Sequence, residues 1–294
     1  RLTKQEIVDL RNKHLSPSLS LSYSSTIPNG LHIIRGDGQY LFDSENNKYL
    51  DCRNNVQHIG HSNKILTKCI SKQVSLLNTN TRYLHENIVI YASKLTKLLP
   101  SPLNYATFVN SGSEANEFAL RVSTSYHKQQ QKRNHIIAFE HGYHGNTTSC
   151  INVSHYKLID QPSKPLNIPD HIHFLSIPDM YRGKHLFDPK FDNKSHSKNE
   201  DKVCDYYINE LSLLIDIIDP SRNKIAAMIG ETVIGCGGQV FLPRKFLLKC
   251  KQLFIKKYGE DTQRPLIIID EVQCGFGRLG YPYYWAFQHN TCLL

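Results

Sequence analysis

The chain has 294 residues, of which 40% are hydrophobic and 21% charged, a composition that excludes an intrinsically disordered, collagen-like or coiled-coil protein. Its formal net charge is +9, but the densest basic patch, residues 128–133, is too short to predict nucleic-acid binding. The longest apolar run, Leu211 to Ile218, falls far short of the roughly 18 residues that cross a bilayer, so we expect neither a nucleic-acid partner nor a membrane span.

The first fifteen residues, RLTKQEIVDLRNKHL, mix both charge signs and lack the apolar core of a secretory signal. They predict an N-terminal helix. The sequence begins with Arg1 and not with methionine, which leaves a preceding targeting segment open. Its eight cysteines are scattered without a CxxC pair or zinc-ligand spacing, so we expect a reducing compartment and no metal site.

Further along, Gly36–Leu50 predicts a β-hairpin with its turn near residues 45–47. Short β-branched runs then alternate with helical patterns, which predicts an α/β fold with a mostly parallel sheet sandwiched by helices. The predicted strands are Tyr105–Val109, His135–Phe139, His171–Ser176, Ile225–Ile229 and Leu266–Ile269. The predicted helices are Glu114–Lys128, Asp205–Ile218 and Arg244–Tyr258, and the polar segment Lys184–Lys202 is expected to be a surface loop.

Within the first of these helices, apolar residues follow the i, i+3, i+4, i+7 spacing of a core-facing stripe. The stripe comprises Ala115, Phe118, Ala119 and Val122.

The segment just before this helix, NSGSEAN (residues 110–116), has small residues where a strand gives way to a helix. It has two readings that the spacing alone does not separate. Ser111 or Ser113 could simply cap the helix, or the free N–H groups of the helix start could bind a phosphate.

Other side chains follow the predicted strands at their carboxyl ends, where ligands bind in open α/β sheets. The strand ending at Phe139 is followed by HGYHG, which contains Tyr143 between glycines. Glu231 and Asp270 stand at the ends of two further strands. Together these positions offer a phosphate cradle, an aromatic platform and two carboxylates, which predicts a small-molecule site.

Two nucleotide-binding motifs are matched only superficially. The aliphatic strand LIIIDE resembles a Walker B strand, but the sequence contains no G-x-x-x-x-G-K-[ST] loop. Residues 275–280 satisfy G-x-G-x-x-G, but aromatic residues and Pro282 follow in place of a helix. We therefore expect neither a nucleotide triphosphatase nor a dinucleotide-binding site.

With these residues in view, the sequence resembles the class III pyridoxal-phosphate-dependent aminotransferases. The resemblance runs along nearly the whole chain, and FVNSGSEANEFALR and IIIDEVQCGFGRLG carry it. LLNTNTRYLHENIV, PDMYRGKH and the stretch CGG at 236–238 resemble the phospho-lyase branch of this family. Thr232, which stands where the aminotransferases proper carry proline, points the same way.

The resemblance implies a fold-type I transferase that binds pyridoxal 5'-phosphate. Ser111, Gly112 and Ser113 would bind the cofactor phosphate, Tyr143 would stack on its ring, and Asp270 would pair with the ring nitrogen. Val272 would lie against the other ring face, Gln273 near the 3-hydroxyl, and Glu231 on the substrate side.

The family's Schiff-base lysine follows the Asp-Glu-Val-Gln segment, yet no lysine occurs after Lys257. No catalytic residue is therefore assigned, and the chain is expected to be truncated at its C-terminus and inactive alone. We expect an N-terminal segment, residues 1–75, with part of a small domain, and an incomplete cofactor-binding large domain, residues 76–294.

The resemblance also implies a function. The complete enzyme would be a phospho-lyase acting on ethanolamine phosphate or a related phosphorylated amine, with transamination of the alanine–glyoxylate type as the alternative. It would form a homodimer in the mitochondrial matrix or cytoplasm. A third possibility is a non-catalytic fragment that only associates with intact subunits.

Overall fold

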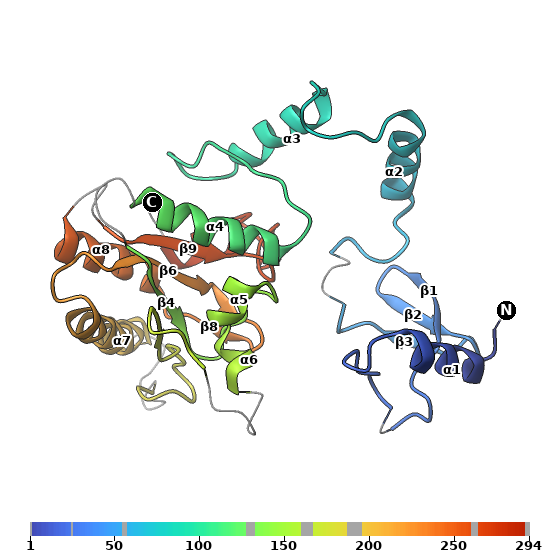
Figure 1. Ribbon diagram of the computed structural model, residues 1–294, viewed down its shortest axis with the longest axis horizontal. Helices are drawn as coiled ribbons and strands as arrows, with labels where there is room; N and C mark the ends of the chain where they lie inside the picture. The colour runs from blue at the N-terminus through green and yellow to red at the C-terminus, as the bar shows by residue number, and fades with distance from the viewer. Residues whose placement is uncertain are drawn as a thin grey trace. The chain divides into compact units, whose positions relative to one another are not determined.

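The computed structural model describes residues 2–24, 26–54, 58–127, 133–159, 167–186, 196–259 and 264–291. Contacts divide the chain into two compact units, Arg1–His85 and Glu86–Leu294, and each has its own architecture (Figure 1).

The N-terminal unit begins with helix α1 (Lys4–His14), which confirms the predicted N-terminal helix. A capping box fixes its start: the Thr3 Oγ1 accepts from the Glu6 N–H at 3.3 Å, and the Glu6 carboxylate accepts from the Thr3 N–H at 2.7 Å. Such reciprocal bonds satisfy donors that the first helical turn leaves unpaired.

The predicted hairpin of this unit is part of a three-stranded antiparallel sheet of β1 (Ile33–Asp37), β2 (Tyr40–Asp43) and β3 (Lys48–Leu50). The predicted turn is confirmed, because Asp43 accepts hydrogen bonds from the Glu45 and Asn47 N–H groups between β2 and β3. Helix α2 (Lys64–Leu76), which the sequence did not predict, buries none of its side chains. No apolar side chain in the described part of 2–85 is fully buried.

The second unit contains the predicted parallel sheet. Its order is β5-β4-β6-β9, and every neighbouring pair is parallel. The strands are β4 (His135–Phe139), β5 (Ile172–Leu175), β6 (Ile225–Glu231) and β9 (Leu266–Asp270). Four of the five predicted strands and the α/β class are thereby confirmed.

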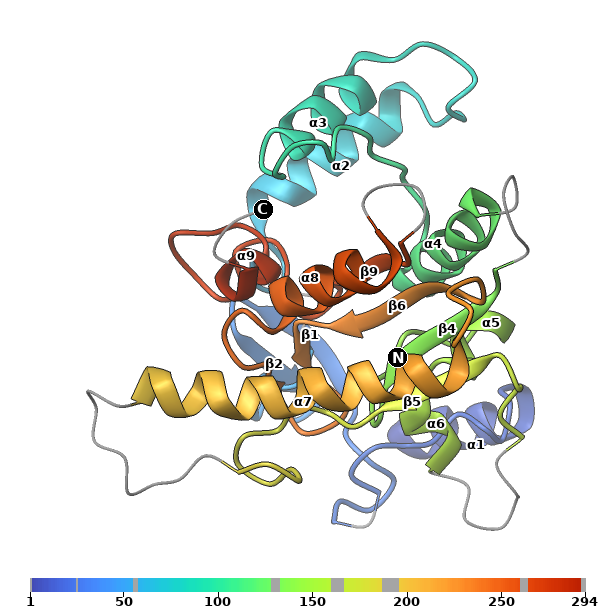
Figure 2. The ribbon, with the colours of Figure 1, turned by 90° about the vertical axis from the view of Figure 1, so that its left-hand side faces the viewer.

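Helices cover both faces of this sheet, and each face has its own core. On one face, α7 (His196–Ile218) and α8 (Phe246–Tyr258) pack large side chains against the strands, among them Tyr207, Leu211, Phe246 and Phe254. Figure 2 looks onto this face and shows α7 lying across the strands. On the other face, α4 (Gly112–Tyr126) and α5 (Thr148–Asn152) enclose a smaller core around Leu120 and Ile136.

The remaining elements of this unit are short or peripheral. They are α3 (Glu86–Thr96), α6 (His155–Ile159), the two-stranded β7 (Val233–Ile234) and β8 (Val240–Phe241), and α9 (Ala286–Thr291). Among the described helices, none combines the length and apolar character needed to traverse a bilayer.

The bounds of α4 and α8 lie within two residues of the prediction, and the largest difference is at α7. Helix α7 begins at His196 and not at Asp205, so the C-terminal part of the predicted surface loop Lys184–Lys202 is helical, while residues 187–195 lie outside the described part of the chain. Most of the basic patch 128–133 lies there too. Its last residue, Arg133, is buried and donates to the Arg222 carbonyl at 2.9 Å.

The predicted strand Tyr105–Val109 is wrong. These residues pair with no strand in the described part of the chain, and the Tyr105 side chain is 96% exposed. A strand needs a neighbour to accept its backbone hydrogen bonds, and the aromatic and β-branched pattern of this segment says nothing about whether one is present.

The core-facing stripe predicted for α4 is also wrong. Phe118 and Val122 are 43% and 45% exposed, and Ala115 is exposed as well. The buried residues of the helix are instead Asn116, Leu120 and Ser123, which follow the same helical spacing one position later. The periodicity identified the helix, but two of the three buried residues on its inner face are polar.

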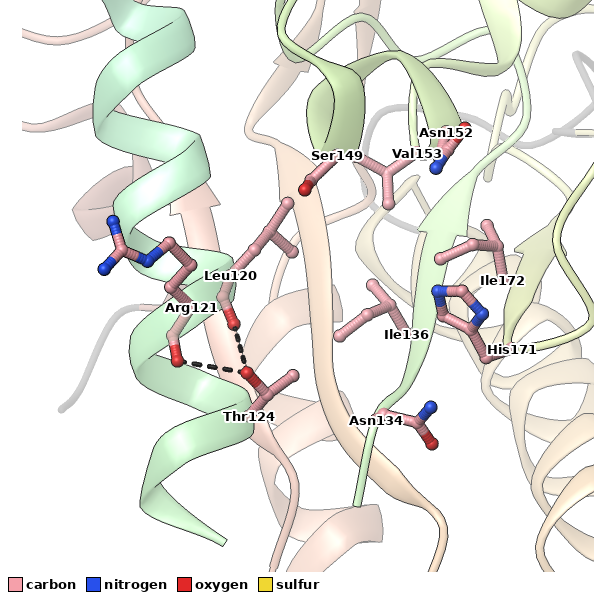
Figure 3. Close-up of a pocket in the computed structure, with 10 residues that line it drawn as sticks. All are labelled: Leu120, Arg121, Thr124, Asn134, Ile136, Ser149, Asn152, Val153, His171 and Ile172. Atoms are coloured by element: carbon pink, nitrogen blue, oxygen red, sulfur yellow. Dashed lines mark hydrogen bonds between the residues drawn. The ribbon is translucent and has the colours of Figure 1, made fainter. Parts of the chain in front are cut away.

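A groove of about 160 Å³ opens between α4, α5, β4 and β5. Figure 3 shows Leu120, Ile136 and Val153 pointing toward its interior. It also reaches Asn134 and His171, which precede their strands. The groove therefore lies toward the amino ends of the strands, away from the predicted site.

The described cysteines are all free thiols. Cys150, Cys204, Cys250 and Cys274 are buried, whereas Cys52, Cys69 and Cys236 are exposed.

Candidate functional site

The predicted site residues gather at the carboxyl ends of β4, β6 and β9 and at the start of α4. Asn116 of α4 joins two of these ends, because its amide donates to the Asp270 Oδ2 at 2.8 Å and to the His144 carbonyl at 3.0 Å. The Tyr143 N–H donates to the Glu231 Oε1 at 3.1 Å. Side chains separated by up to 154 residues in sequence are thus fixed in one hydrogen-bonded cluster.

Asp270, the last residue of β9, is buried and remains ionised. Burial alone would raise the pKa of its carboxyl, but the hydrogen bond and charge of His144 and the bonds from the Val272 N–H and Asn116 lower it below the usual value. The His144 Nδ1 lies 2.9 Å from Oδ2, which also receives Asn116. Among the described residues, Oδ1 accepts a bond from the Val272 N–H alone, at 3.0 Å, so it keeps capacity for a further donor.

The pKa of Glu231, at the end of β6, shifts in the opposite direction to that of Asp270. Burial raises the pKa of its carboxyl above the usual value, although backbone N–H groups of Gly235 and Tyr143 partly offset the effect. The Gly235 N–H donates to Oε2 at 2.9 Å. Glu231 therefore ties the chain after β6 to the loop that carries Tyr143.

The start of α4 shows which serine caps the helix. Ser111 is the helix cap, since its Oγ accepts from the Glu114 N–H at 3.1 Å. Ser113 is not a cap, and its Oγ accepts from the Asn146 N–H at 3.2 Å. In the described residues no acceptor lies within reach of the Gly112 and Ser113 N–H groups, so this helix start can still receive an anion.

Gly145 lets the loop after β4 approach that helix start. Its φ is +127°, and a Cβ there would lie 2.4 Å from the Ser113 Oγ. A side chain at this position would therefore push the loop away from α4. The close approach keeps Tyr143 and His144 beside the helix start.

Val272 and Gln273 border the same region. A Cβ on Gly112 would lie 2.6 Å from Val272 Cγ2, and one on Gly235 would lie 3.4 Å from Gln273 Cδ. Val272 is 65% exposed, so its side chain is available to a ligand. All eight predicted residues thus border one region, with Val272 and Gln273 directly after Asp270.

Sequence reasoning missed the residues that hold the predicted ones in place. His144 and Asn116 lie within quoted motifs but had no assigned role, and both are buried against Asp270. Asn116 could have been found from its place on the Leu120–Ser123 face of α4.

Glu271 was also missed. It accepts from the Ala286 and Phe287 N–H groups at 2.8 Å each, so it caps α9, and the Thr232 Oγ1 donates to it at 2.9 Å.

The arrangement suits a flat, phosphorylated, nitrogen-containing ring. The free N–H groups of α4 can hold a phosphate, the Tyr143 ring offers a surface for stacking, and ionised Asp270 can accept from a protonated ring nitrogen. The His144 Nε2 is buried and has no hydrogen-bond partner within the described part of the chain, which leaves one further polar atom available beside Asp270. Across the described residues, no group of three or more His, Cys, Asp or Glu side chains is arranged to hold a metal ion.

Comparisons with known proteins show which family the chain is similar to. The family model for class-III aminotransferases matches residues 23–292. A Drosophila melanogaster protein named alanine–glyoxylate aminotransferase 2-like is 36% identical over 293 residues, which are 100% of this chain and 54% of that protein. A Caenorhabditis elegans protein named ethanolamine-phosphate phospho-lyase homolog 1 is 34% identical over 97% of this chain and 57% of its own length.

Among solved structures, a phospholyase from Arthrobacter in complex with phosphoethanolamine superposes with a TM-score of 0.76 at 26% identity. The match covers 96% of this chain and 59% of that one. The chain thus spans little more than half the length of the relatives it matches.

Proposed function

The chain belongs to the class-III aminotransferase family, and we propose that its site binds pyridoxal phosphate, the cofactor of that family. Gly112 and Ser113 would hold the cofactor phosphate through their N–H groups, with Ser111 fixing the helix start. Tyr143 and Val272 would lie against the two faces of the ring, Gln273 would lie near its 3-hydroxyl, and Glu231 would face the substrate.

Asp270 is the observation that carries this proposal. A buried carboxylate whose pKa is held below its usual value stays charged, and its Oδ1 has room for one more donor. It would keep the ring nitrogen protonated. When bound, pyridoxal phosphate supplies an electron sink for negative charge on the carbon next to the substrate nitrogen. His144 and Asn116 would orient Asp270 for this role.

Within the family we propose a phospho-lyase. The protein that contains this chain would convert ethanolamine phosphate, or a related phosphorylated amine, and water into an aldehyde, ammonia and inorganic phosphate. Support comes from the names of the worm and Arthrobacter relatives and from Thr232, whose hydroxyl bonds to Glu271 where a proline could not. Since no lysine follows Lys257, we assign to these residues the binding of the cofactor and not its covalent attachment.

Equilibrium dialysis of pyridoxal phosphate against the chain tests the binding site. Asp270→Asn keeps the side-chain shape but removes the charge, and it should weaken binding by about 10- to 100-fold, the loss expected for one charge-assisted hydrogen bond. Asp219→Asn is the matched control, because Asp219 is also a buried aspartate but lies at the other end of the sheet. Equal affinities in the two variants would contradict the proposal.

The reaction itself is tested on the protein that carries this chain together with the family's Schiff-base lysine. Release of inorganic phosphate from ethanolamine phosphate is the expected result. Amino transfer from alanine to glyoxylate without phosphate release would favour the transaminase that the Drosophila relative's name describes. Association with intact subunits without cofactor binding would favour a non-catalytic role.

A further inference from the structure

Lys157 of α6 places its ammonium group beside the proposed cofactor platform. Its Nζ lies 5.7 Å from the centre of the Tyr143 ring and 5.7 Å from that of Tyr156. The side chain is half-buried. Among the described residues no carboxylate pairs with it, so it is a cation available to a bound anion.

The loop after β4 holds the backbone of α6 at this place. The Tyr156 N–H donates to the Gly142 carbonyl at 3.2 Å, and the His141 N–H donates to the His155 Nδ1 at 3.0 Å. The His155 ring also packs edge-on against Phe174 of β5, with centroids 4.7 Å apart. Lys157 therefore keeps a fixed relation to Tyr143, and only its flexible stem adjusts.

The charge of Lys157 also acts on Cys236, in the segment that follows β7. Burial raises the pKa of the Cys236 thiol, the charge of Glu231 raises it further, and the charge of Lys157 lowers it. Lys157 thus lies within electrostatic reach of the chain that follows Glu231, the residue proposed to face the substrate.

Another cation, Arg182, lies beside Gly238 and is already engaged. Its Nη2 lies 3.4 Å from where a Cβ of Gly238 would stand, but its Nε is 3.6 Å from the Asp179 carboxylate and its side chain is 65% exposed. An exposed arginine with its own acid offers less to a ligand than an unpaired, half-buried lysine.

We propose that Lys157 binds the phosphate of the phosphorylated amine and thereby selects that substrate class, an inference that rests on the proposed phospho-lyase function. A phosphomonoester carries roughly −1.5 to −2 charges at neutral pH. A lysine on a flexible stem suits it as a mobile point charge. An amino acid without a distal phosphate would gain nothing from this contact.

Two stable conjugates test the inference without catalysis. Reductive amination joins pyridoxal phosphate to ethanolamine phosphate in one and to ethanolamine in the other, so that they differ only in the distal phosphate. Calorimetric titration of the chain should show the phosphorylated conjugate binding about 10- to 100-fold more tightly. Lys157→Met should remove most of that preference and change the affinity for the ethanolamine conjugate by no more than about twofold. Lys157→Arg should restore part of the preference.

Arg182→Met is the matched control and should leave the preference intact. Equal weakening of both conjugates by Lys157→Met would show that the lysine merely supports the Tyr143 ring. Loss of the preference in Arg182→Met but not in Lys157→Met would show that Arg182 binds the phosphate. Either result overturns the inference while the cofactor proposal stands. Failure of the unmodified chain to bind either conjugate would overturn both.

Discussion

On the α7/α8 face of the sheet, helices bury large side chains such as Tyr207, Phe246 and Phe254 against the strands. On the α4/α5 face, the core consists of smaller side chains, a groove reaches Leu120, and Asn116 and Ser123 occupy the inner side of α4. Burial of apolar area is the main source of stability, whereas an ionised carboxylate such as Asp270 needs polar neighbours. The difference teaches that one face of the sheet supplies most of the stability, whereas the other brings the polar side of α4 to the site at the strand ends.

The largest effect should come from the α7/α8 face. Phe254→Ala removes a fully buried ring and should lower the free energy of unfolding by about 3–5 kcal/mol, as measured by urea denaturation. A loss below about 1 kcal/mol would mean that this core is not the main stabilising contact.

A smaller loss is expected on the α4/α5 face. Leu120 is 6% exposed and lines the groove, so Leu120→Ala should cost about 2–3 kcal/mol, the low end for a buried leucine. The same denaturation experiment measures it. If this variant lost more stability than Phe254→Ala, the contrast between the two faces would be refuted.

The link between α7 and β6 should make stability depend on pH. Asp219 accepts bonds from the backbone N–H groups of Asn223, Lys224 and Ile225 and from the Tyr258 hydroxyl. Burial opposes ionisation, but these bonds prevail and lower the pKa of Asp219. Its contribution is therefore present above the unfolded-state pKa of about 3.9 and is lost as the pH falls through the lower folded value.

Asp219→Asn should thus cost about 1–3 kcal/mol at pH 7, and the difference from the unmodified chain should shrink as the pH falls below about 4. Urea denaturation over this pH range provides the measurement. A constant difference would show that the Asp219 charge does not contribute.

The smallest effect is expected on the outer side of α4. Phe118 is 43% exposed, so Phe118→Ala should change the free energy of unfolding by no more than about 0.5 kcal/mol. As a Phe→Ala change it is also the matched control for Phe254. A loss of several kcal/mol would restore the core-facing stripe that the apolar spacing predicted.

The outcome for α4 shows what the sequence could and could not predict. Helical periodicity located the helix, and short apolar runs located β6 and β9. An apolar strand is expected to be buried on both faces; β6 is buried throughout, whereas Leu266–Ile269 of β9 are only half-buried. Which side of a helix is covered depends on its neighbours, and here Asn116 turns inward because Asp270, far along the chain, accepts its hydrogen bond.

The same reasoning applies to Tyr105–Val109 and to the site. The residue pattern of a strand is local in sequence, whereas the strand that pairs with it can lie far away in sequence. Residues 105–109 have the pattern of a strand but pair with no strand among the described residues. Tyr143, Glu231 and Asp270 were predictable because strand ends meet at one edge of a sheet. The orienting role of His144 was not, since it depends on a contact with a residue 126 positions away.

The free cysteines give this chain a built-in set of chemical reporters. Cys204 and Cys250 lie in the α7/α8 core and Cys150 in the α4/α5 core. Burial raises the pKa of Cys204 to about 12, so its thiol resists alkylation until the surrounding structure opens. Cys52 and Cys69 in the N-terminal unit are exposed from the start. The order in which these thiols are alkylated therefore reports the order in which the regions of the molecule unfold, and no cysteine has to be introduced for the experiment.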